Sequence, residues 1–533
     1  MRYALRLQPL IFALALLCLW VPAGALELEQ GGQYKRIHLR ALQAILNDQT
    51  DEAIQALQDY ASKEPDDPET WYMLAVAHSQ RGAVDDARAA AAKAVELGLP
   101  AERFLAGPHG PLHALLRDAE FQQFATERAS EPIHGPMLGC VTHKSAAFWV
   151  RTFGEKRVHI NIMLDPLDKL AVAHGEACTS TAEDFTAVLK VKGLRPETTY
   201  YYELRVGEAG EIVRGVFHTF PKPGKPGAFR IVFGGGAGYV PPHEHMWNTI
   251  RAHKPDAFLA LGDNVYIDTP TWPEVQRYCY YRRQSRPEWR ALVAGTPFYA
   301  IYDDHDFGEN DCWCGAEIDD PMWKRPVWRV FQQNWVNPYY GCGDKQPGCW
   351  FDFSMGDVDI FMLDCRYYRT DPEQPNPSML GPAQKQWLFK RLRKSKGTFR
   401  VLASSVPWAS GTKPGSLDTW DGFPAEREEI FSFLEKHRIN GVILLSADRH
   451  RSDAWRIPRP NGYDFYEFES SRLTNQHVHK TMEQALFSYN ATQSFGLLSF
   501  DTRKDDPEVT YNIINIDGEC VYTLNLKHSQ LKH

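Results

Sequence analysis

The chain has 533 residues, with 59 Lys and Arg against 67 Asp and Glu, which gives a formal net charge of −8. Apolar residues make up 43% of the sequence and charged residues 24%, a composition that excludes global disorder. A chain of this length is expected to form about three domains. The acidic balance argues against nucleic acid as the main partner, because proteins that bind the phosphate backbone are usually basic.

The first 25 residues have the pattern of a secretory signal peptide. Arg2 and Arg6 precede an apolar run over residues 10–21, and small residues at 23–25 supply a cleavage site. This run is short for a transmembrane helix, which needs about 20 residues, and no later segment approaches that length. We therefore expect residues 1–25 to be removed and the mature protein to be exported, to the periplasm or the extracellular space, without a transmembrane anchor. An uncleaved anchor is the alternative.

Cysteine usage leaves the redox state open. Export permits disulfides, and the nine cysteines that follow the signal are an odd number, so at least one thiol is unpaired within the chain. Cys342 and Cys349 could close a short loop. A zinc knot that also uses Cys312 and Cys314 is conceivable, although the spacing matches no strong zinc pattern.

Residues 33–128 are expected to form helical repeats. The run Thr70–His78, followed by Gly82 and Ala87, places Trp, Leu-Ala, Gly and Ala at the offsets of a tetratricopeptide repeat, which has a period of about 34 residues. A weaker copy covers residues 37–68. Small residues at these offsets let two helices pack closely. The module serves either as a spacer or as a groove for a protein partner.

Two further domains follow. Period-two strands with Gly and Pro turns over residues 132–221 predict a small β-sandwich, and a Pro- and Gly-rich linker ends it. Residues 228–527 alternate short apolar runs with helical segments, which predicts a layered α/β domain with buried strands. The apolar runs are Phe229–Phe233, Ala257–Leu261, Phe298–Tyr302, Val358–Leu363, Arg400–Ala403 and Val442–Leu445.

Clusters of polar residues follow four of these runs, at residues 262–266, 303–311, 364–366 and 446–450. Ligands of α/β sheets bind beyond the carboxyl ends of the strands, so four strands could deliver Asp, His, Asn and Tyr to one edge. A lone Gly-Asp is most often a turn or a helix cap. The segment 303–311, however, holds five acids, a His and an Asn, which contribute little to a core. Because metal ions relieve the repulsion between converging carboxylates, we predict a metal site.

These motifs resemble the PhoD-like (alkaline phosphatase D) group of calcineurin-like metallophosphoesterases. The resemblance covers residues 130–525 and implies a metallophosphoesterase sandwich of layered α/β type, preceded by the family's small β-sandwich; the helical repeats lie outside it. The matching motifs, in chain order, are Gly-Asp-Asn-Val-Tyr (262–266), Asp-Asp-His-Asp-Phe-Gly-x-Asn-Asp (303–311), Leu-Asp-x-Arg-Tyr-Tyr-Arg (363–369), Leu-Gly-x-x-Gln-x-x-Trp-Leu (380–388) and Ser-Ala-Asp-Arg-His (446–450).

The resemblance also implies a dinuclear metal centre and a role for each matching residue. His305 is similar to the histidine that contacts the substrate phosphate and protonates the leaving group. Arg366 either holds phosphate oxygens through its planar guanidinium or forms a structural salt bridge. The implied metal ligands are Asp263, which bridges both ions, with Tyr266, Asp304, Asn310, Asp448 and His450.

One position departs from the family pattern. Gly236 stands where the family has a metal-binding Cys. The expected ions are Ca²⁺ with Fe³⁺ or Mn²⁺, and without the thiolate the site has either more water ligands or only harder ions. His243 and His245 are candidates to replace the Cys. Alternatively, the Gly-rich loop lets backbone N–H groups approach a phosphate.

The function implied is metal-assisted phosphoester hydrolysis, in which a metal-bound hydroxide attacks phosphorus and His305 assists departure of the alcohol. The same site would serve a phosphodiesterase or phospholipase D-type enzyme acting on lipid or cell-wall diesters, and the sequence does not choose between them. A third reading is a degenerate phosphatase domain in an exported scaffold that binds partners through its helical repeats. Only the missing Cys supports it.

Overall fold

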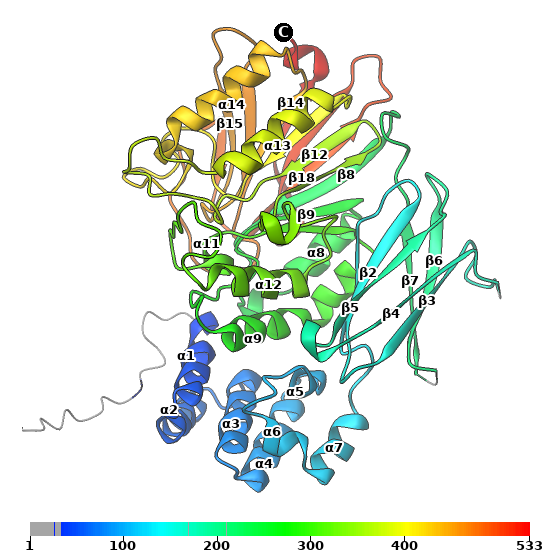
Figure 1. Ribbon diagram of the computed structural model, residues 1–533, viewed down its shortest axis with the longest axis vertical. Helices are drawn as coiled ribbons and strands as arrows, with labels where there is room; N and C mark the ends of the chain where they lie inside the picture. The colour runs from blue at the N-terminus through cyan, green and yellow to red at the C-terminus, as the bar shows by residue number, and fades with distance from the viewer. Residues whose placement is uncertain (1–25, 27–33, 169, 209) are drawn as a thin grey trace, which may run out of the picture.

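The computed structural model describes residue 26 and residues 34–168, 170–208 and 210–533. The predicted signal peptide, residues 1–25, lies outside this part of the chain. None of the helices in the described residues is both long and apolar enough to cross a membrane. The chain forms a helical module, a small β-sandwich and a large domain built on two sheets (Figure 1).

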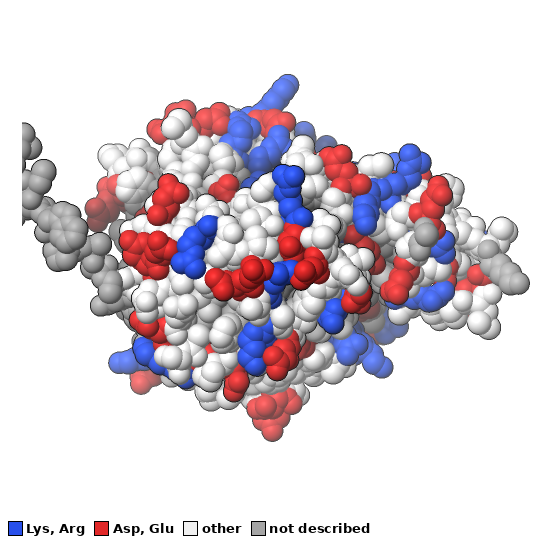
Figure 2. Space-filling model, turned by 90° about the horizontal axis from the view of Figure 1, so that it is seen from below, with Lys and Arg blue, Asp and Glu red and all other residues white. Residues whose placement is uncertain are grey.

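The helical module occupies one end of the molecule (Figure 1). Asp67 begins α3 by accepting a hydrogen bond from the Thr70 N–H, and the buried alanines of α4 allow α3 and α4 to pack closely. The helices are α1 (Tyr34–Leu46), α2 (Thr50–Lys63), α3 (Pro68–Gln80), α4 (Val84–Glu96), α5 (Glu102–Ala106), α6 (His113–Leu116) and α7 (Ala119–Thr126). On the face of the molecule at this end, Lys and Arg side chains alternate with Asp and Glu (Figure 2). A partner of the repeats would therefore meet a surface of mixed charge.

The β-sandwich consists of two antiparallel sheets. One has the order β1-β2-β5 and the other β4-β3-β6-β7. Alternate residues Tyr200, Tyr202 and Leu204 of β6 are buried, as the period-two pattern requires. The strands are β1 (His134–Gly139), β2 (Ser145–Arg151), β3 (Arg157–Met163), β4 (Ala173–Cys178), β5 (Thr186–Lys192), β6 (Thr199–Val206) and β7 (Ile212–His218).

Two mixed sheets form the large domain. The six-stranded sheet has the order β10-β9-β8-β18-β19-β20 and the seven-stranded sheet β11-β12-β13-β14-β16-β15-β17. The first contains β8 (Ala228–Gly234), β9 (Ala257–Leu261), β10 (Phe298–Ile301), β18 (Ser494–Asp501), β19 (Glu508–Asn515) and β20 (Cys520–Lys527). The second contains β11 (Phe351–Met355), β12 (Val358–Met362), β13 (Phe399–Ala403), β14 (Val442–Ser446), β15 (Ser452–Ile457), β16 (Phe465–Ser470) and β17 (Phe487–Tyr489).

The predicted apolar runs are the parallel strands of these sheets: β8, β9 and β10 in the first, and β12, β13 and β14 in the second. They are mostly apolar because both faces of each sheet are covered, with Arg230, Asp359 and Arg400 as the charged exceptions. All five residues of β14 are fully buried, and each apolar side chain so buried contributes about 1.5–3 kcal/mol to folding. The expectation of a single sheet edge was wrong, because β9 and β10 lie in one sheet and β12 and β14 in the other.

Helices enclose the two sheets. In Figure 1, α13 (Gly381–Lys394) and α14 (Pro424–Lys436) cover the seven-stranded sheet. Nearer the helical module lie α8 (Met246–Ala252), α9 (Pro273–Gln284), α10 (Pro287–Val293), the single turn α11 (Asp304–Phe307) and α12 (Lys324–Asn334). The nine cysteines of the described residues are all unpaired, and none belongs to a group of potential metal ligands.

Candidate metal centre

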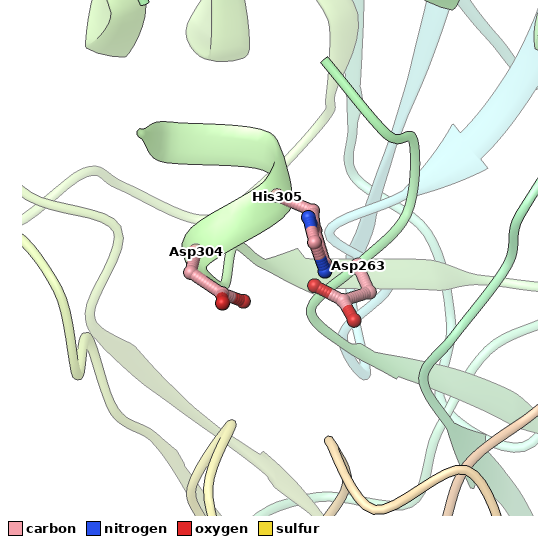
Figure 3. A group of neighbouring side chains, drawn as sticks. All are labelled: Asp263, Asp304 and His305. Atoms are coloured by element: carbon pink, nitrogen blue, oxygen red, sulfur yellow. The ribbon is translucent and has the colours of Figure 1, made fainter. Parts of the chain in front are cut away.

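The candidate site lies where the parallel strands of the two sheets end. Asp263 follows β9 directly, and Asp304 and His305 form the turn after β10. Asp448 and His450 follow β14, on the facing sheet. Figure 3 shows that the side chains of Asp263, Asp304 and His305 converge on one region. One ligand atom from each of these three residues lies within 4.8 Å of the other two.

Tyr266 joins this group to the facing sheet. Its hydroxyl donates to Asp263 Oδ2 at 3.0 Å and lies 3.2 Å from His450 Nε2. His450 Nε2 is in turn 3.9 Å from Asp263 Oδ2. Three of the predicted ligands are therefore within direct reach of one another, although 184 residues separate Tyr266 from His450.

Three of the predicted ligands have a strained backbone conformation. Asp263, Asp448 and His450 have φ angles of 52°, 71° and 48°, in the left-handed region that favours glycine. Each such residue costs about 1–3 kcal/mol, which only a surrounding structure that over-determines the loop can maintain. Strain of this kind clusters at functional sites, and here it coincides with the predicted ligands.

Several carboxylate oxygens of the site are buried without a hydrogen-bond donor. Burial, and then the negative charges of Asp304 and Asp303, raise the pKa of Asp263 well above its ordinary range. Within the described structure, Asp263 Oδ1, Asp303 Oδ2 and Asp304 Oδ1 are buried and accept no hydrogen bond. Buried polar atoms are normally paired, and a bound cation is the usual compensation for converging buried carboxylates. The residues present therefore fit the metal centre that the motifs predict.

His305 is oriented by a carboxylate that the sequence motifs did not single out. Its Nδ1 bonds to Asp268 Oδ1, and its backbone carbonyl accepts the Ile267 N–H at 2.9 Å. Burial alone would lower the pKa of His305, but the charges of Asp304 and Asp263 and the bond to Asp268 raise it to about 10. The imidazole is thus held as a proton donor at neutral pH, with Nε2 on the side of Asp263 (Figure 3).

Arg366 forms a buried salt bridge with the carboxylates of the site. The side chain is fully buried. Its Nε donates to Asp303 Oδ1, its Nη1 donates to Asp418 Oδ1 at 2.7 Å, and its Nη2 lies 3.7 Å from Asp304 Oδ1. These carboxylates occupy the guanidinium, which agrees with the salt-bridge alternative, and a contact between Arg366 and substrate oxygens stays a prediction. Its charge lowers the pKa values of Asp304 and Asp418 against the opposing effect of burial.

Three other predicted residues lie differently from expectation. Asn310 is exposed, on the loop beyond α11, and belongs to no potential ligand group of the described chain. His245 is exposed, and His243 Nδ1 lies 3.1 Å from the Thr474 carbonyl oxygen. The imidazoles that pack against His450 are those of His477 and His479, with ring centroids 5.0 and 5.4 Å away.

The loop that lacks the family's Cys is closed to any side chain at that point. Gly236 has a φ angle of 68°, and a Cβ added there would lie 2.7 Å from the Arg472 backbone nitrogen and 3.0 Å from Ser471 Oγ. Both distances are shorter than van der Waals contact. The backbone conformation of this loop therefore excludes a cysteine at position 236.

Besides Asp268, the sequence pattern did not reveal the roles of two further polar residues of the site. Asn475 Nδ2 donates to the Tyr266 hydroxyl at 2.6 Å, but Asn475 lies in an irregular segment after β16 without a motif. Asp306 lies in the acidic run, yet its carboxylate accepts the backbone N–H groups of Asn264, Val265 and Asp303. It ties the loop after β9 to the turn after β10. The acidic cluster at 303–311 indicated that Asp306 lies near the site, but it did not indicate this structural role.

The two facing sheets, with this site between their strand ends, define a metallophosphoesterase-type fold. A solved structure of PhoD superposes with a TM-score of 0.61 at 18% identity, covering 72% of this chain and 91% of that chain. The purple acid phosphatase PPD1 from yellow lupin superposes with a TM-score of 0.54 at 12% identity, covering 74% and 75%. The model of the PhoD-like phosphatase family matches residues 231–530. The chain belongs to the PhoD-like phosphatase family, and the resemblance seen in the motifs is confirmed.

The other segments have their own matches. A tetratricopeptide repeat model matches residues 44–99, and a domain of unknown function, DUF7800, matches residues 130–216. Alkaline phosphatase D from Bacillus subtilis (strain 168) is 26% identical over 317 residues, which are 50% of this chain and 53% of that protein. The chain thus matches about half the length of this relative.

Proposed function

We propose that this protein is a metal-dependent phosphoester hydrolase of the alkaline phosphatase D type. The observation that carries the proposal is the convergence of Asp263, Asp304 and His305 from the ends of adjacent strands, with buried carboxylate oxygens that lack hydrogen bonds. A degenerate scaffold would have no reason to retain this costly arrangement of buried charge.

The residues available to hold two ions are Asp263, Tyr266, Asp304, Asp448 and His450, and the proximity of Asp263 to Asp304, Tyr266 and His450 supports a bridging role for it. Their carboxylate, phenolate and imidazole groups suit Ca²⁺ together with Fe³⁺ or Mn²⁺. When bound, such ions polarise phosphoryl oxygens and lower the pKa of water, which supplies the nucleophile.

The protein's own contribution is orientation and proton transfer. Asp268 on Nδ1 fixes the ring of His305 so that Nε2 serves the site. Because the pKa of His305 is raised to about 10, its imidazolium can protonate the departing alkoxide. Lys413 lies 3.9 Å from Asp448 Oδ2 and bonds to Asp311 Oδ1 at 2.8 Å, and Arg366 compensates the acids behind the site.

The N-terminal pattern of residues 1–25 supports export as part of this proposal, to the periplasm or the extracellular space. The tetratricopeptide match supports a protein partner for the helical module.

The test is hydrolysis of a chromogenic phosphate monoester and the matching diester. Chelator-treated protein lacking residues 1–25 would receive Ca²⁺, Mn²⁺, Fe³⁺ and Zn²⁺ singly and in pairs. We expect turnover that depends on added metal and is lost in Asp263→Asn, but kept in Asp344→Asn, which alters a carboxylate that is 67% exposed. Faster cleavage of the diester would assign the enzyme to the phosphodiesterase type. Equal turnover by Asp263→Asn and the unmodified enzyme would refute the proposal.

A further inference from the structure

The helical module reaches the candidate site through its first helix. Helix α1 lies against α9 of the two-sheet domain (Figure 1). From α1, Arg36 Nη2 lies 2.6 Å from Asp268 Oδ2, and the other oxygen of Asp268 bonds to His305 Nδ1. Arg36 and Asp268 thus connect α1 to the imidazole of His305, because the Asp268 carboxylate contacts both Arg36 and His305.

A buried polar interface fixes the module in this position. Glu69 of α3 accepts a hydrogen bond from the Tyr278 hydroxyl of α9 at 2.6 Å and pairs with Arg103 Nη2 at 2.6 Å. None of these three residues is more than 1% exposed. The ring of Tyr72 also stacks on that of Tyr278, with centroids 6.2 Å apart. Glu69 and Arg103 both belong to the module, so the buried contacts of Tyr278 are what join the module to α9 of the two-sheet domain.

The same helix, α9, supports the loop that carries the site. Cys279 Sγ lies 3.7 Å from the Tyr266 carbonyl oxygen, within hydrogen-bond distance for sulfur. Further along this loop, Asp268 has a φ angle of 55°, so its backbone is strained and needs its contacts to stay in place. The module therefore contacts the loop directly through Arg36, and it also packs against α9, which contacts the same loop.

A carboxylate on one ring nitrogen of a histidine sets the ring's orientation and the nitrogen that faces the reaction. Asp268 lies beside the site that holds Asp263 and Asp304, and it reaches that site through its bond to His305. Arg36 places a positive charge beside the oxygen of Asp268 that does not contact His305. The ion pair is partly exposed, with side chains 31% and 16% accessible, so its contribution to folding is small.

We propose that Arg36 is a positioning residue for His305, so that the helical module completes the active site of the two-sheet domain. The inference rests on the proposed function for its kinetic readout, while a second readout is independent of activity.

The kinetic test compares Arg36→Gln and Arg36→Lys with the unmodified holoenzyme. General-acid assistance matters for an alkyl phosphoester and little for an activated aryl ester, whose leaving group departs unaided. Loss of a residue that orients such a histidine costs about 10–100-fold. We expect Arg36→Gln to lose at least about 10-fold in kcat on the alkyl ester and less than about threefold on the aryl ester, with partial recovery in Arg36→Lys. Arg81→Gln, which removes an exposed ion pair within the repeats, is the matched control and should match the unmodified enzyme.

Hydrogen–deuterium exchange of segments 262–270 and 304–308 in the same proteins is the second readout. Arg36→Gln should exchange faster in both segments, while Arg81→Gln should not. Unchanged exchange together with unchanged kcat on the alkyl ester would overturn the proposal. If the unmodified protein hydrolyses no phosphoester, the proposed function fails, and the exchange result alone then decides whether Arg36 positions His305.

Discussion

Replacing Arg366 by Met should lower the free energy of unfolding, because it removes a buried cation from the carboxylates of the site. The guanidinium is completely buried and is shared between Asp303, Asp418 and, at 3.7 Å, Asp304. After the replacement, Asp418 keeps Arg369 at 2.7 Å and Lys413 at 3.0 Å, whereas Asp303 and Asp304 lose their cation. Breaking a buried pair in this way costs about 3–5 kcal/mol of unfolding free energy.

The cost should depend on pH with a definite sign. Arg366 lowers the pKa of Asp304 and, with its neighbours, holds that of Asp418 well below its ordinary range. A carboxyl group whose folded pKa is lowered contributes stability above its unfolded pKa and loses it as the pH falls. In Arg366→Met that contribution is reduced, and Asp303, whose pKa burial raises to about 7 against the lowering effect of Arg366, also loses its cation. Ionised Asp303 and Asp304 then destabilise the variant at high pH and are relieved by protonation as the pH falls. The difference from the unmodified protein should therefore be largest near pH 8 and shrink toward pH 4.

Urea unfolding followed by tryptophan fluorescence, with chelator present, measures this difference at pH 8 and pH 5. Arg329→Met is the matched control, because it removes an ion pair whose side chains are 50% and 67% exposed, and it should cost less than about 1 kcal/mol. A cost for Arg366→Met as small as that of the control, or one that grows on acidification, would refute the reasoning.

Three further predictions concern the site loops. Asp306→Ala leaves three buried backbone N–H groups without an acceptor, so it should lower the urea midpoint by the equivalent of about 3 kcal/mol or more, and a midpoint unchanged from the parent would contradict this. Gly236→Cys should lower the melting temperature and add no iron–thiolate absorption band, because its Cβ would lie 2.7 Å from the Arg472 backbone nitrogen; a stable variant with such a band would show that the loop can open. Because the pKa values of Asp263 and Tyr266 are raised well above their ordinary ranges, metal binding at pH 7 should release protons and strengthen as the pH rises. Calorimetry in buffers of different ionisation enthalpy measures that release, and binding without proton release would contradict it.

The parts of the site that the sequence predicted share one property. Asp263, Asp304 and Asp448 each follow a buried strand within a few residues, and parallel strands end at a common edge. An apolar run that stops at an acid therefore predicts both the strand and the direction of the acid. The same pattern could not predict that these strands belong to two different sheets, because strand pairing depends on contacts between segments that are distant in sequence.

The residues that were missed reach the site by other routes. Asn475 comes from an irregular segment, and Arg36 comes from a different domain more than 200 residues away in the chain. Neither has a local pattern that points to the site. For Arg366, the motif supplied the residue but not its partner, and only the position of Asp418 distinguishes a salt bridge from a substrate contact. Strands β15–β20 were not foreseen, because polar residues such as Asp453 and Glu469 are buried within them and interrupt the apolar pattern.

The central claim is that Asp263 anchors a metal centre between the two sheets. Its most direct test is the metal content of the folded protein after incubation with Ca²⁺, Mn²⁺ and Fe³⁺ and removal of the excess, measured by inductively coupled plasma mass spectrometry. We expect about two ions per chain in the unmodified protein and in Asp344→Asn, and fewer than about one in Asp263→Asn, with unchanged circular dichroism. An unmodified protein that retains no metal, or an Asp263→Asn variant that retains as much as its parent, would contradict it.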